Sequence, residues 1–261
     1  MTFCLGMKCE EGLLAIADTR ITSGTETSLA KKISVHQHEE HSMFILTSGL
    51  RSIRDKALTY FEERLEEDES DLTRLYRAAN ALAGEMRRVR SEDERWLVES
   101  GLSFDLHCVI GGQLQDDEEA RLYLVYPEGN WVEVQSGTPY VIIGESRYGK
   151  PILDRAWSHE QPLVNALRDG LLAFDATFTS ASDVDPPVDC VLYRNNSYHV
   201  SERRFEAEDL AVLREYWGNA LRAAVDDAVP LITPLMDALD EGPATPDRIS
   251  PVRPSAQNQP A

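Results

Sequence analysis

Short runs of apolar residues dominate the N-terminal part of the chain, and their lengths are typical of β-strands. The predicted strands are, in order, 2–7, 13–17, 32–36 and 43–48. The polar segments 8–12 and 38–41 separate the members of each pair, so the pattern predicts two hairpins. The segment 21–30 is rich in Ser and Thr and is predicted to be a loop between the hairpins.

Two amphipathic helices are predicted after the hairpins. Apolar residues recur on one face of the segments 50–67 and 72–89. Ser70 and Asp71 precede the second segment and are suited to cap its N-terminus. The charged segment 91–101 is predicted to be a linker or an irregular turn. Helices that follow hairpins favour a sheet covered by a helical layer.

The C-terminal half repeats this order of strands followed by helices. Strands are predicted at 104–111, 120–126, 131–135, 140–144, 188–195 and 198–201. Helices are predicted at 147–157, 163–173 and 208–229. Successive hairpins form a mainly antiparallel sheet, unlike the strand–helix alternation of a doubly wound fold. The pattern therefore predicts an α+β chain.

The composition is that of a globular chain with a strong acidic excess. Its 261 residues suffice for one substantial core, and a single domain is the default. A net charge of −19 argues against a nucleic-acid surface and against anionic membranes. No apolar run approaches the ~18 residues of a transmembrane helix. Glu10 and Glu11 interrupt the position where a signal peptide has its apolar region, so a cytoplasmic location is expected.

Neither a cofactor nor a metal site is expected. The cysteines lie in or beside apolar runs and form no Cys-x-x-Cys pair, so reduced core thiols are predicted at Cys4, Cys9, Cys108 and Cys190. His36, His38 and His41 lie close together on the second hairpin and raise the alternative of a metal site. A plain surface hairpin is favoured, because the turn is polar and no further ligands are suggested. The proline-rich residues 242–261 are predicted to be a disordered tail.

Thr2 is the candidate nucleophile, because it stands directly behind the initiator methionine. Removal of Met1 gives Thr2 a free α-amine beside its own hydroxyl, and this amine can be the base that a hydroxyl nucleophile needs. An α-amine titrates near pH ~7.7–8.0, so part of it accepts protons at cellular pH. The hairpin beginning at Thr2 keeps this chain end from fraying, and its second strand carries Asp18 and Arg20 back toward it.

Several sequence blocks, taken in order, resemble a proteasome-type β-subunit of the N-terminal nucleophile hydrolase superfamily. They are Thr2 opening a strand, Ala17-Asp18-Thr19-Arg20-Ile21-Thr22-Ser23-Gly24, Lys32-Ile33 and Thr47-Ser48-Gly49. The chain is most similar to the bacterial Anbu (ancestral β-subunit) proteins, through Ile143-Gly144-Glu145-Ser146-Arg147-Tyr148-Gly149-Lys150-Pro151-Ile152-Leu153-Asp154-Arg155 and Val184-Asp185-Pro186-Pro187-Val188-Asp189. The family usually has glycine where Asp185 stands. The resemblance covers about residues 2–230 and implies one proteasome β-subunit-like domain, a four-layer αββα sandwich.

The resemblance also implies the central residues of an active site. Thr2 matches the nucleophile, and its amine matches the proton shuttle. Lys32 matches the active-site lysine because Ile33 follows it, and Lys31 is the shifted alternative. Asp18 matches the carboxylate that pairs with this lysine and orients it. A buried ammonium beside the Thr2 hydroxyl favours alkoxide character and keeps the neighbouring amine unprotonated.

Further positions follow from the same resemblance. Gly49 matches the residue whose backbone N–H faces the developing oxyanion. Ser146 matches a serine that relays protons near the terminal amine. Arg20 matches a supporting residue that shapes the site through hydrogen bonds. A second relay pair falls among three residues that the alignment does not separate, Ser180, Ser182 and Asp183.

These matches imply a threonine peptidase that hydrolyses peptide or amide bonds in a peptide or protein substrate. They also imply self-association into a closed ring or an open spiral. One alternative is a self-assembling scaffold with little or no peptidase activity. Another is a nucleophile elbow at 144–149, in which Ser146 acts with His199 and with Asp183 or Asp189. The elbow is disfavoured because the Gly-x-Ser-x-Gly pattern is missed by one residue and hairpins, rather than βαβ units, precede it.

Overall fold

The computed structural model describes residues 2–23, 26–67 and 72–240. The chain divides into two compact units, of which the first ends at Arg214 and the second begins at Glu215. All the predicted site residues belong to the first unit.

Two five-stranded antiparallel sheets form the centre of the first unit. The first sheet has the order β10-β1-β2-β11-β12, from β1 (Phe3–Cys9), β2 (Gly12–Asp18), β10 (Tyr140–Gly144), β11 (Val188–Arg194) and β12 (Val200–Phe205). The second has the order β5-β6-β7-β8-β9, from β5 (Ile33–His38), β6 (His41–Gly49), β7 (Leu106–Gln113), β8 (Arg121–Val125) and β9 (Trp131–Glu133). A separate pair consists of β3 (Arg20–Ser23) and β4 (Glu26–Leu29).

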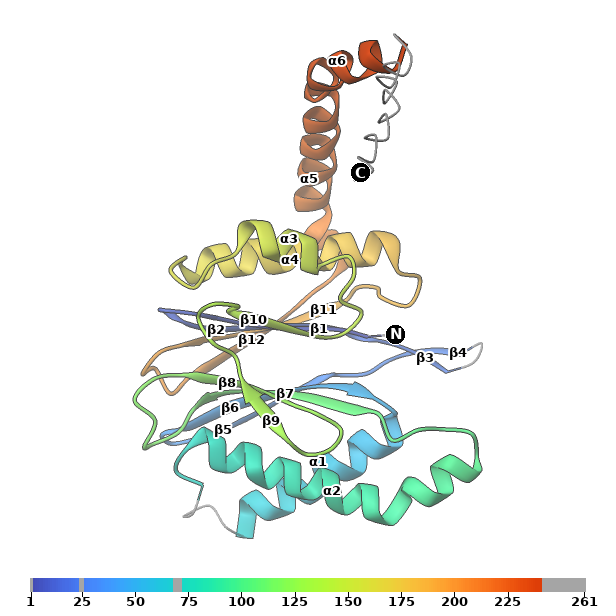
Figure 1. The fold of residues 1–261 in the computed structure, drawn as a ribbon. Coiled ribbons are helices and arrows are strands. Elements are labelled where there is room, and N and C mark those ends of the chain that lie inside the picture. Colours follow the sequence, from blue (N-terminus) through green and yellow to red (C-terminus); the bar gives the residue numbers. More distant parts are fainter. Residues whose placement is uncertain (1, 24–25, 68–71, 241–261) are drawn as a thin grey trace, which may run out of the picture. The chain divides into compact units, whose positions relative to one another are not determined.

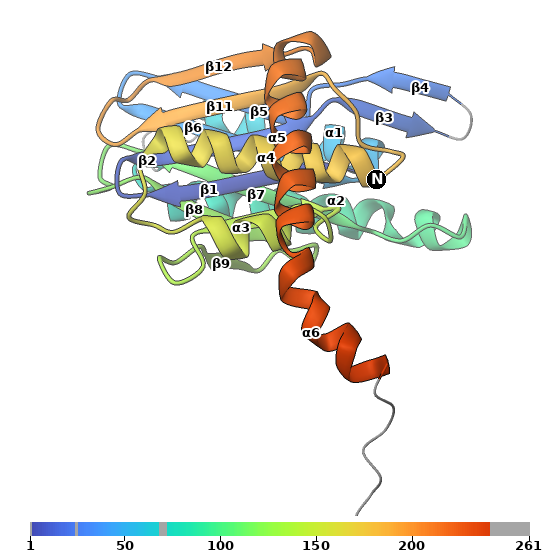
Figure 2. The same cartoon turned by 90° about the horizontal axis from the view of Figure 1, so that it is seen from above.

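Helices cover the outer face of each sheet, which gives four layers in the order αββα (Figure 1). The helices α1 (Arg51–Glu67) and α2 (Leu75–Glu99) pack on the second sheet. On the first sheet lie α3 (Lys150–Ala156) and α4 (Leu163–Ser180), and α4 follows β1 and β2 when seen from above (Figure 2). This arrangement confirms the predicted α+β sandwich.

Each interface between layers has its own apolar cluster, and the central strands contribute to two of them. Along β1, Phe3 and Leu5 face the layer of α3 and α4, whereas Cys4 faces the space between the sheets. Every residue of β1 and β2 is buried. The sequence shows short apolar runs here because both faces of these strands are covered. All four cysteines are buried and unpaired.

Two predictions about connecting segments were wrong. The segment 21–30 contains most of the β3–β4 pair rather than a loop, and its polar composition conceals the pairing. The segment 91–101 is mostly helix, because α2 continues to Glu99. Ion pairs between residues four apart, Arg90 with Glu94 and Arg95 with Glu99, lie along this charged part of α2.

The start of α2 also differs from the prediction. The proposed capping residues Ser70 and Asp71 lie outside the described residues. The helix begins at Leu75, whose backbone N–H donates to the carboxylate of Asp117 at 2.8 Å. The cap therefore comes from a residue distant in sequence, which local patterns do not reveal.

The last helices extend beyond the first unit. The predicted helix 208–229 corresponds to α5 (Ala207–Asp227), and a further helix, α6 (Val229–Asp240), was not predicted. Among the residues of α5, Leu210 alone is buried. The predicted disordered tail, 242–261, lies outside the described residues.

Candidate active site

Thr2 lies at the start of β1, where the first sheet holds the chain end from both sides. Phe3 pairs with Gly144 of β10, and the backbone N–H of Glu145 donates to the Thr2 carbonyl at 2.6 Å. On the other side, Cys4 pairs with Ala17 of β2. Gly144 has φ +87°, and a Cβ atom there would lie 2.0 Å from the Thr2 carbonyl oxygen. The close approach of these two segments therefore requires glycine.

Asp18 connects the start of the chain with Lys32. The Lys32 Nζ atom lies 2.8 Å from each carboxylate oxygen of Asp18. The same carboxylate accepts a hydrogen bond of 2.8 Å from the backbone N–H of Phe3, the residue after Thr2. Asp18 is fully buried and Lys32 is 4% exposed. Lys31, in contrast, points to Glu202, 2.8 Å away, so Lys32 is the lysine that joins Asp18.

The electrostatics of this pair follow from its burial. Removal from water raises the pKa of Asp18, and the ammonium of Lys32 and the hydrogen bond from Phe3 oppose that rise. Burial also raises the pKa of the neighbouring Cys4 thiol. Its Sγ donates to the Thr47 carbonyl at 3.6 Å, so Cys4 is a protonated core thiol rather than a competing nucleophile.

Gly49 ends the strand that lies beside Lys32. The Lys32 carbonyl accepts hydrogen bonds from the backbone N–H of Thr47, at 3.1 Å, and from its hydroxyl, at 3.4 Å. Two residues later, Gly49 has φ +145°, and a Cβ atom there would lie 1.9 Å from the carbonyl oxygen of Asp105. Packing against β7 thus requires glycine at this position, independently of any role in catalysis.

Arg20 is bound to the segment that contains the unusual Asp185. The backbone N–H and the hydroxyl of Thr19 donate to the Pro187 carbonyl at 3.2 and 2.8 Å. Val188 then pairs with Asp18 in the sheet. The Arg20 guanidinium forms an ion pair with Asp185. The segment 185–188 therefore runs alongside Asp18, Thr19 and Arg20.

The predicted relay residues lie on two turns of the first unit. Ser146 follows β10, and its carbonyl accepts the backbone N–H of Lys150 at 3.0 Å as α3 begins. Ser180 is the last residue of α4 and is exposed, and Asp183 follows on the segment that leads to β11. Ser182, between them, is also exposed.

The nucleophile-elbow alternative finds no support in the positions of its partners. The Asp189 carboxylate is held by Arg204, at 2.7 and 2.9 Å. His199 Nδ1 lies 3.4 Å from the side-chain amide of Gln37, at the opposite end of β5 from Lys32. Asp189 and His199 thus contact other residues instead of forming a triad with Ser146.

Glu145, which sequence reasoning did not select, lies beside Thr2, and Arg147 binds Glu145. Glu145 is 4% exposed, and its carboxylate binds the side chain and backbone N–H of Arg147. The only sequence signal was a pair of opposite charges on either side of Ser146. The proximity of Glu145 to Thr2 depends on the pairing of β1 with β10, which no local pattern specifies.

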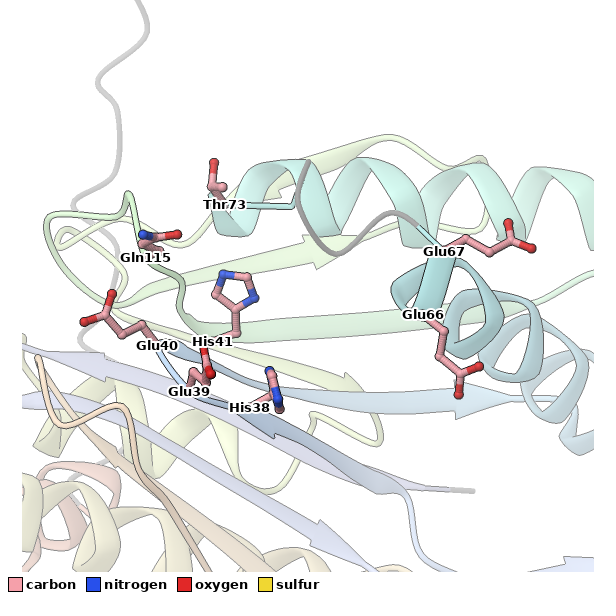
Figure 3. A pocket seen from close by; sticks show the side chains of 8 residues that line it. All are labelled: His38, Glu39, Glu40, His41, Glu66, Glu67, Thr73 and Gln115. Carbon is pink, nitrogen blue, oxygen red and sulfur yellow. The ribbon is translucent and has the colours of Figure 1, made fainter.

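Two histidines of the second hairpin, His38 and His41, line a separate cavity (Figure 3). Its volume is about 530 Å³. The cavity is bounded by the β5–β6 turn, the end of α1 and the loop after β7, and is lined by His38, Glu39, Glu40, His41, Glu66, Glu67, Thr73 and Gln115. His36 lies deeper and packs edge-on against Phe61. Within the described ranges, no three His, Cys, Asp or Glu side chains form a group that would hold a metal ion.

Comparisons with known proteins identify the family and the fold of this chain. The proteasome subunit family matches residues 2–183. A mutant of Anbu from Hyphomicrobium sp. strain MC1 is 32% identical, with a TM-score of 0.80, over 87% of this chain and 99% of that one. No curated protein matches the chain.

Two further solved structures are similar over nearly their whole length. Anbu from Yersinia bercovieri is 28% identical, with a TM-score of 0.80, over 86% of this chain and 96% of that one. The helical assembly of the Anbu complex from Pseudomonas aeruginosa is 25% identical, with a TM-score of 0.80, over 95% of this chain and 100% of that one.

Among the helices that the structure describes, none is long and apolar enough to cross a membrane.

Proposed function

The chain belongs to the proteasome subunit family and within it to the Anbu proteins, and from this premise we propose that it is a threonine peptidase subunit. Its nucleophile is Thr2, which removal of Met1 exposes. The substrate is a peptide or protein, and the bond that is hydrolysed is a peptide or amide bond. The observation that carries the proposal is the buried Asp18 carboxylate, which binds both the Phe3 backbone N–H and the Lys32 ammonium.

This arrangement suits the first half of an acyl transfer. The neutral amine of Thr2 takes the proton of the Thr2 hydroxyl while the oxygen attacks the substrate carbonyl. The Lys32 ammonium stabilises the negative charge that develops on the attacking oxygen, and Asp18 keeps this lysine charged and oriented. The backbone N–H of Gly49 is assigned to the oxyanion, a contribution worth about 2.7–4 kcal/mol for one such donor.

The second half reuses the same groups. The protonated amine gives its proton to the leaving nitrogen as the substrate C–N bond breaks, which leaves an ester between the acyl group and Thr2. A water molecule then attacks this ester. The amine accepts the proton of the water and returns one to the Thr2 oxygen, so the acid product leaves and the enzyme is restored. Ser146 is assigned to proton relay near the amine, and a second relay to a pair among Ser180, Ser182 and Asp183.

The test begins with the state of the chain end. Intact-mass measurement shows whether Met1 has been removed, and a panel of fluorogenic peptides then measures turnover. Thr2→Ala is expected to abolish hydrolysis without unfolding the protein. Thr59→Ala is the matched control, because the Thr59 hydroxyl is exposed on α1 and bonds only the local Asp55 carbonyl. Turnover that survives Thr2→Ala would overturn the peptidase proposal, and retained Met1 would favour the scaffold alternative.

Self-association is the second part of the proposal. The helix α6 carries six exposed apolar side chains, Val229, Leu231, Ile232, Leu235, Met236 and Leu239. An apolar face of this size is typical of a surface that another protein covers. A relative is known as a helical assembly. We infer that copies of this chain assemble through heterologous contacts into a closed ring or an open spiral, in the cytoplasm.

Light scattering and electron microscopy of the purified protein test this part. Assemblies much larger than one chain are expected. Leu235→Asp, on the apolar face of α6, is expected to reduce their size, whereas Asp237→Asn on the same helix is the control. A wild-type protein that remains monomeric at micromolar concentration would contradict the assembly proposal.

A further inference from the structure

Glu145 is tied to Thr2 through the backbone. Its N–H donates to the Thr2 carbonyl at 2.6 Å, directly after the Phe3–Gly144 pair that ends the β1–β10 ladder. The position of Glu145 and the position of the candidate nucleophile are therefore fixed relative to each other.

The side chain of Glu145 is a nearly buried carboxylate with a single cationic partner. Its side chain is 3% exposed, whereas that of Arg147 is 69% exposed. Arg147 donates to it from the backbone N–H at 3.0 Å, from Nε at 2.9 Å and from Nη2 at 2.5 Å. Such a forked arrangement of charged donors is strong and geometrically specific. It also fixes the turn that carries Ser146 between the two residues.

We propose that Glu145 and Arg147 are positioning residues that together control the protonation of the Thr2 amine. The inference rests on the proposed function, in which this amine must be neutral to act as a base. An unpaired carboxylate beside the amine would hold it as an ammonium ion. Arg147 opposes this effect, because its positive charge neutralises Glu145 at close range. The pair thus leaves the amine available to accept a proton.

Two other ion pairs belong to the proposed site, Asp18 with Lys32 and Arg20 with Asp185. Asp18 on β2 is paired with Lys32, which precedes β5, so these two charges largely cancel. Asp183, on the segment between α4 and β11, is the remaining acidic group assigned to the site. The hydrogen bond of 2.6 Å from the Glu145 backbone N–H to the Thr2 carbonyl places these two residues side by side. Glu145 is therefore within electrostatic range of the chain end.

The inference predicts shifts of opposite sign for the two partners. Replacing Glu145 with Gln removes the negative charge, so the pKa of the Thr2 amine should fall. Replacing Arg147 with Met leaves the buried carboxylate unopposed, so the pKa of the amine should rise. At distances of several Å near a protein surface, shifts of about 0.5–1 pH unit are expected. The double variant Glu145→Gln/Arg147→Met should lie close to the wild type.

The experiment uses the full chain, produced behind a removable leader so that Thr2 is the first residue. The rate at which a small acylating reagent modifies the Thr2 amine is followed against pH by peptide mapping, without any substrate. Glu119→Gln is the control. It removes the charged partner of Lys8, which lies away from the chain end, and should leave the pKa of the Thr2 amine unchanged. Circular dichroism confirms that each variant is folded, and the remaining folded single variant preserves the test if the other one unfolds.

Opposite shifts in the two single variants would support the inference, and an unmoved amine pKa in a folded single variant would overturn it. Hydrolysis is measured separately. Shifts without peptide hydrolysis would leave the inference standing and defeat the proposed function, whereas hydrolysis without shifts would do the reverse. If both hold, the acid limb of kcat/KM should move with the amine, upward in Arg147→Met and downward in Glu145→Gln.

Discussion

The Lys32 ammonium lies 2.8 Å from both carboxylate oxygens of Asp18, and both residues are buried. A buried ion pair contributes little net stability, because desolvation offsets most of its Coulomb attraction. Its presence beside Thr2 therefore needs a reason other than stability. We infer that the pair exists to keep a charged ammonium at the nucleophile.

Lys32→Met tests this inference directly. The variant should lose about 10²–10⁴-fold in kcat, because it removes the cation that stabilises the attacking oxygen. It should also lower the free energy of unfolding by about 3–5 kcal/mol, because Asp18 is left buried without its partner. Lys31→Met is the matched control, since Lys31 is half exposed and pairs with Glu202. Peptide turnover and urea denaturation measure the two effects, and equal losses in both variants would contradict the assignment.

Asp185 is expected to support the site through Arg20. Asp185→Asn should lower kcat several-fold with little change in KM, because the segment from Asp18 to Arg20 loses one of its attachments to the segment before β11. Stability should change by less than about 1 kcal/mol, since the side chains of both partners are partly exposed. Raising the salt concentration should move the wild type toward the variant.

The decisive comparison for this ion pair is charge exchange. The double variant Arg20→Asp/Asp185→Arg restores opposite charges and should recover part of the lost turnover. A wild-type kcat in Asp185→Asn at low salt would show that the ion pair is irrelevant to the site.

Gly144→Ala should damage both the fold and the site. A Cβ atom at this position meets the Thr2 carbonyl oxygen at 2.0 Å, in a backbone conformation that favours glycine. Unfolding should become easier by about 2–4 kcal/mol, and peptide turnover should be lost because Thr2 is displaced. Gly137→Ala is the control, since nothing lies within 4 Å of the added carbon. Thermal denaturation and turnover of the two variants are compared, and equal behaviour would refute the close-approach argument.

The central strands were predictable because they are buried on both faces, whereas the four-layer order came from the family resemblance. The mainly apolar β1 and β2 give a clear signal, and so do the one-sided helices α1 and α4. The pair β3–β4 gives none, because its residues are polar and lie outside the two main sheets. The end of α2 was missed for a different reason. Its charged residues are joined to each other along the helix rather than packed inward.

The candidate site was predictable only in part, for a physical reason. Thr2, Asp18 and Lys32 lie at element ends that neighbouring strands bring together, so their sequence blocks were informative. Glu145 lies beside Thr2 only because β10 pairs with β1 across most of the chain. Asp185 likewise meets Arg20 through the pairing of β11 with β2. Contacts of this kind depend on sheet order, which a single sequence does not specify.

His36 should make stability depend on pH. Burial lowers the pKa of its imidazole, and its Nε2 atom is buried without a hydrogen-bond partner in the described chain. In the unfolded chain the imidazole titrates near pH 6.5, so between the folded-state pKa and about 6.5 the unfolded chain binds an additional proton. The free energy of unfolding should therefore rise with pH across this window, by up to about 1.4 kcal/mol per pH unit, and level off above it.

Urea denaturation from pH 5 to pH 8 measures the slope of this pH dependence. His36→Leu should remove this contribution, whereas Val35→Ala, a non-titrating change on the same strand, should keep it. An unchanged slope in His36→Leu would mean that other groups govern the acid sensitivity of the fold.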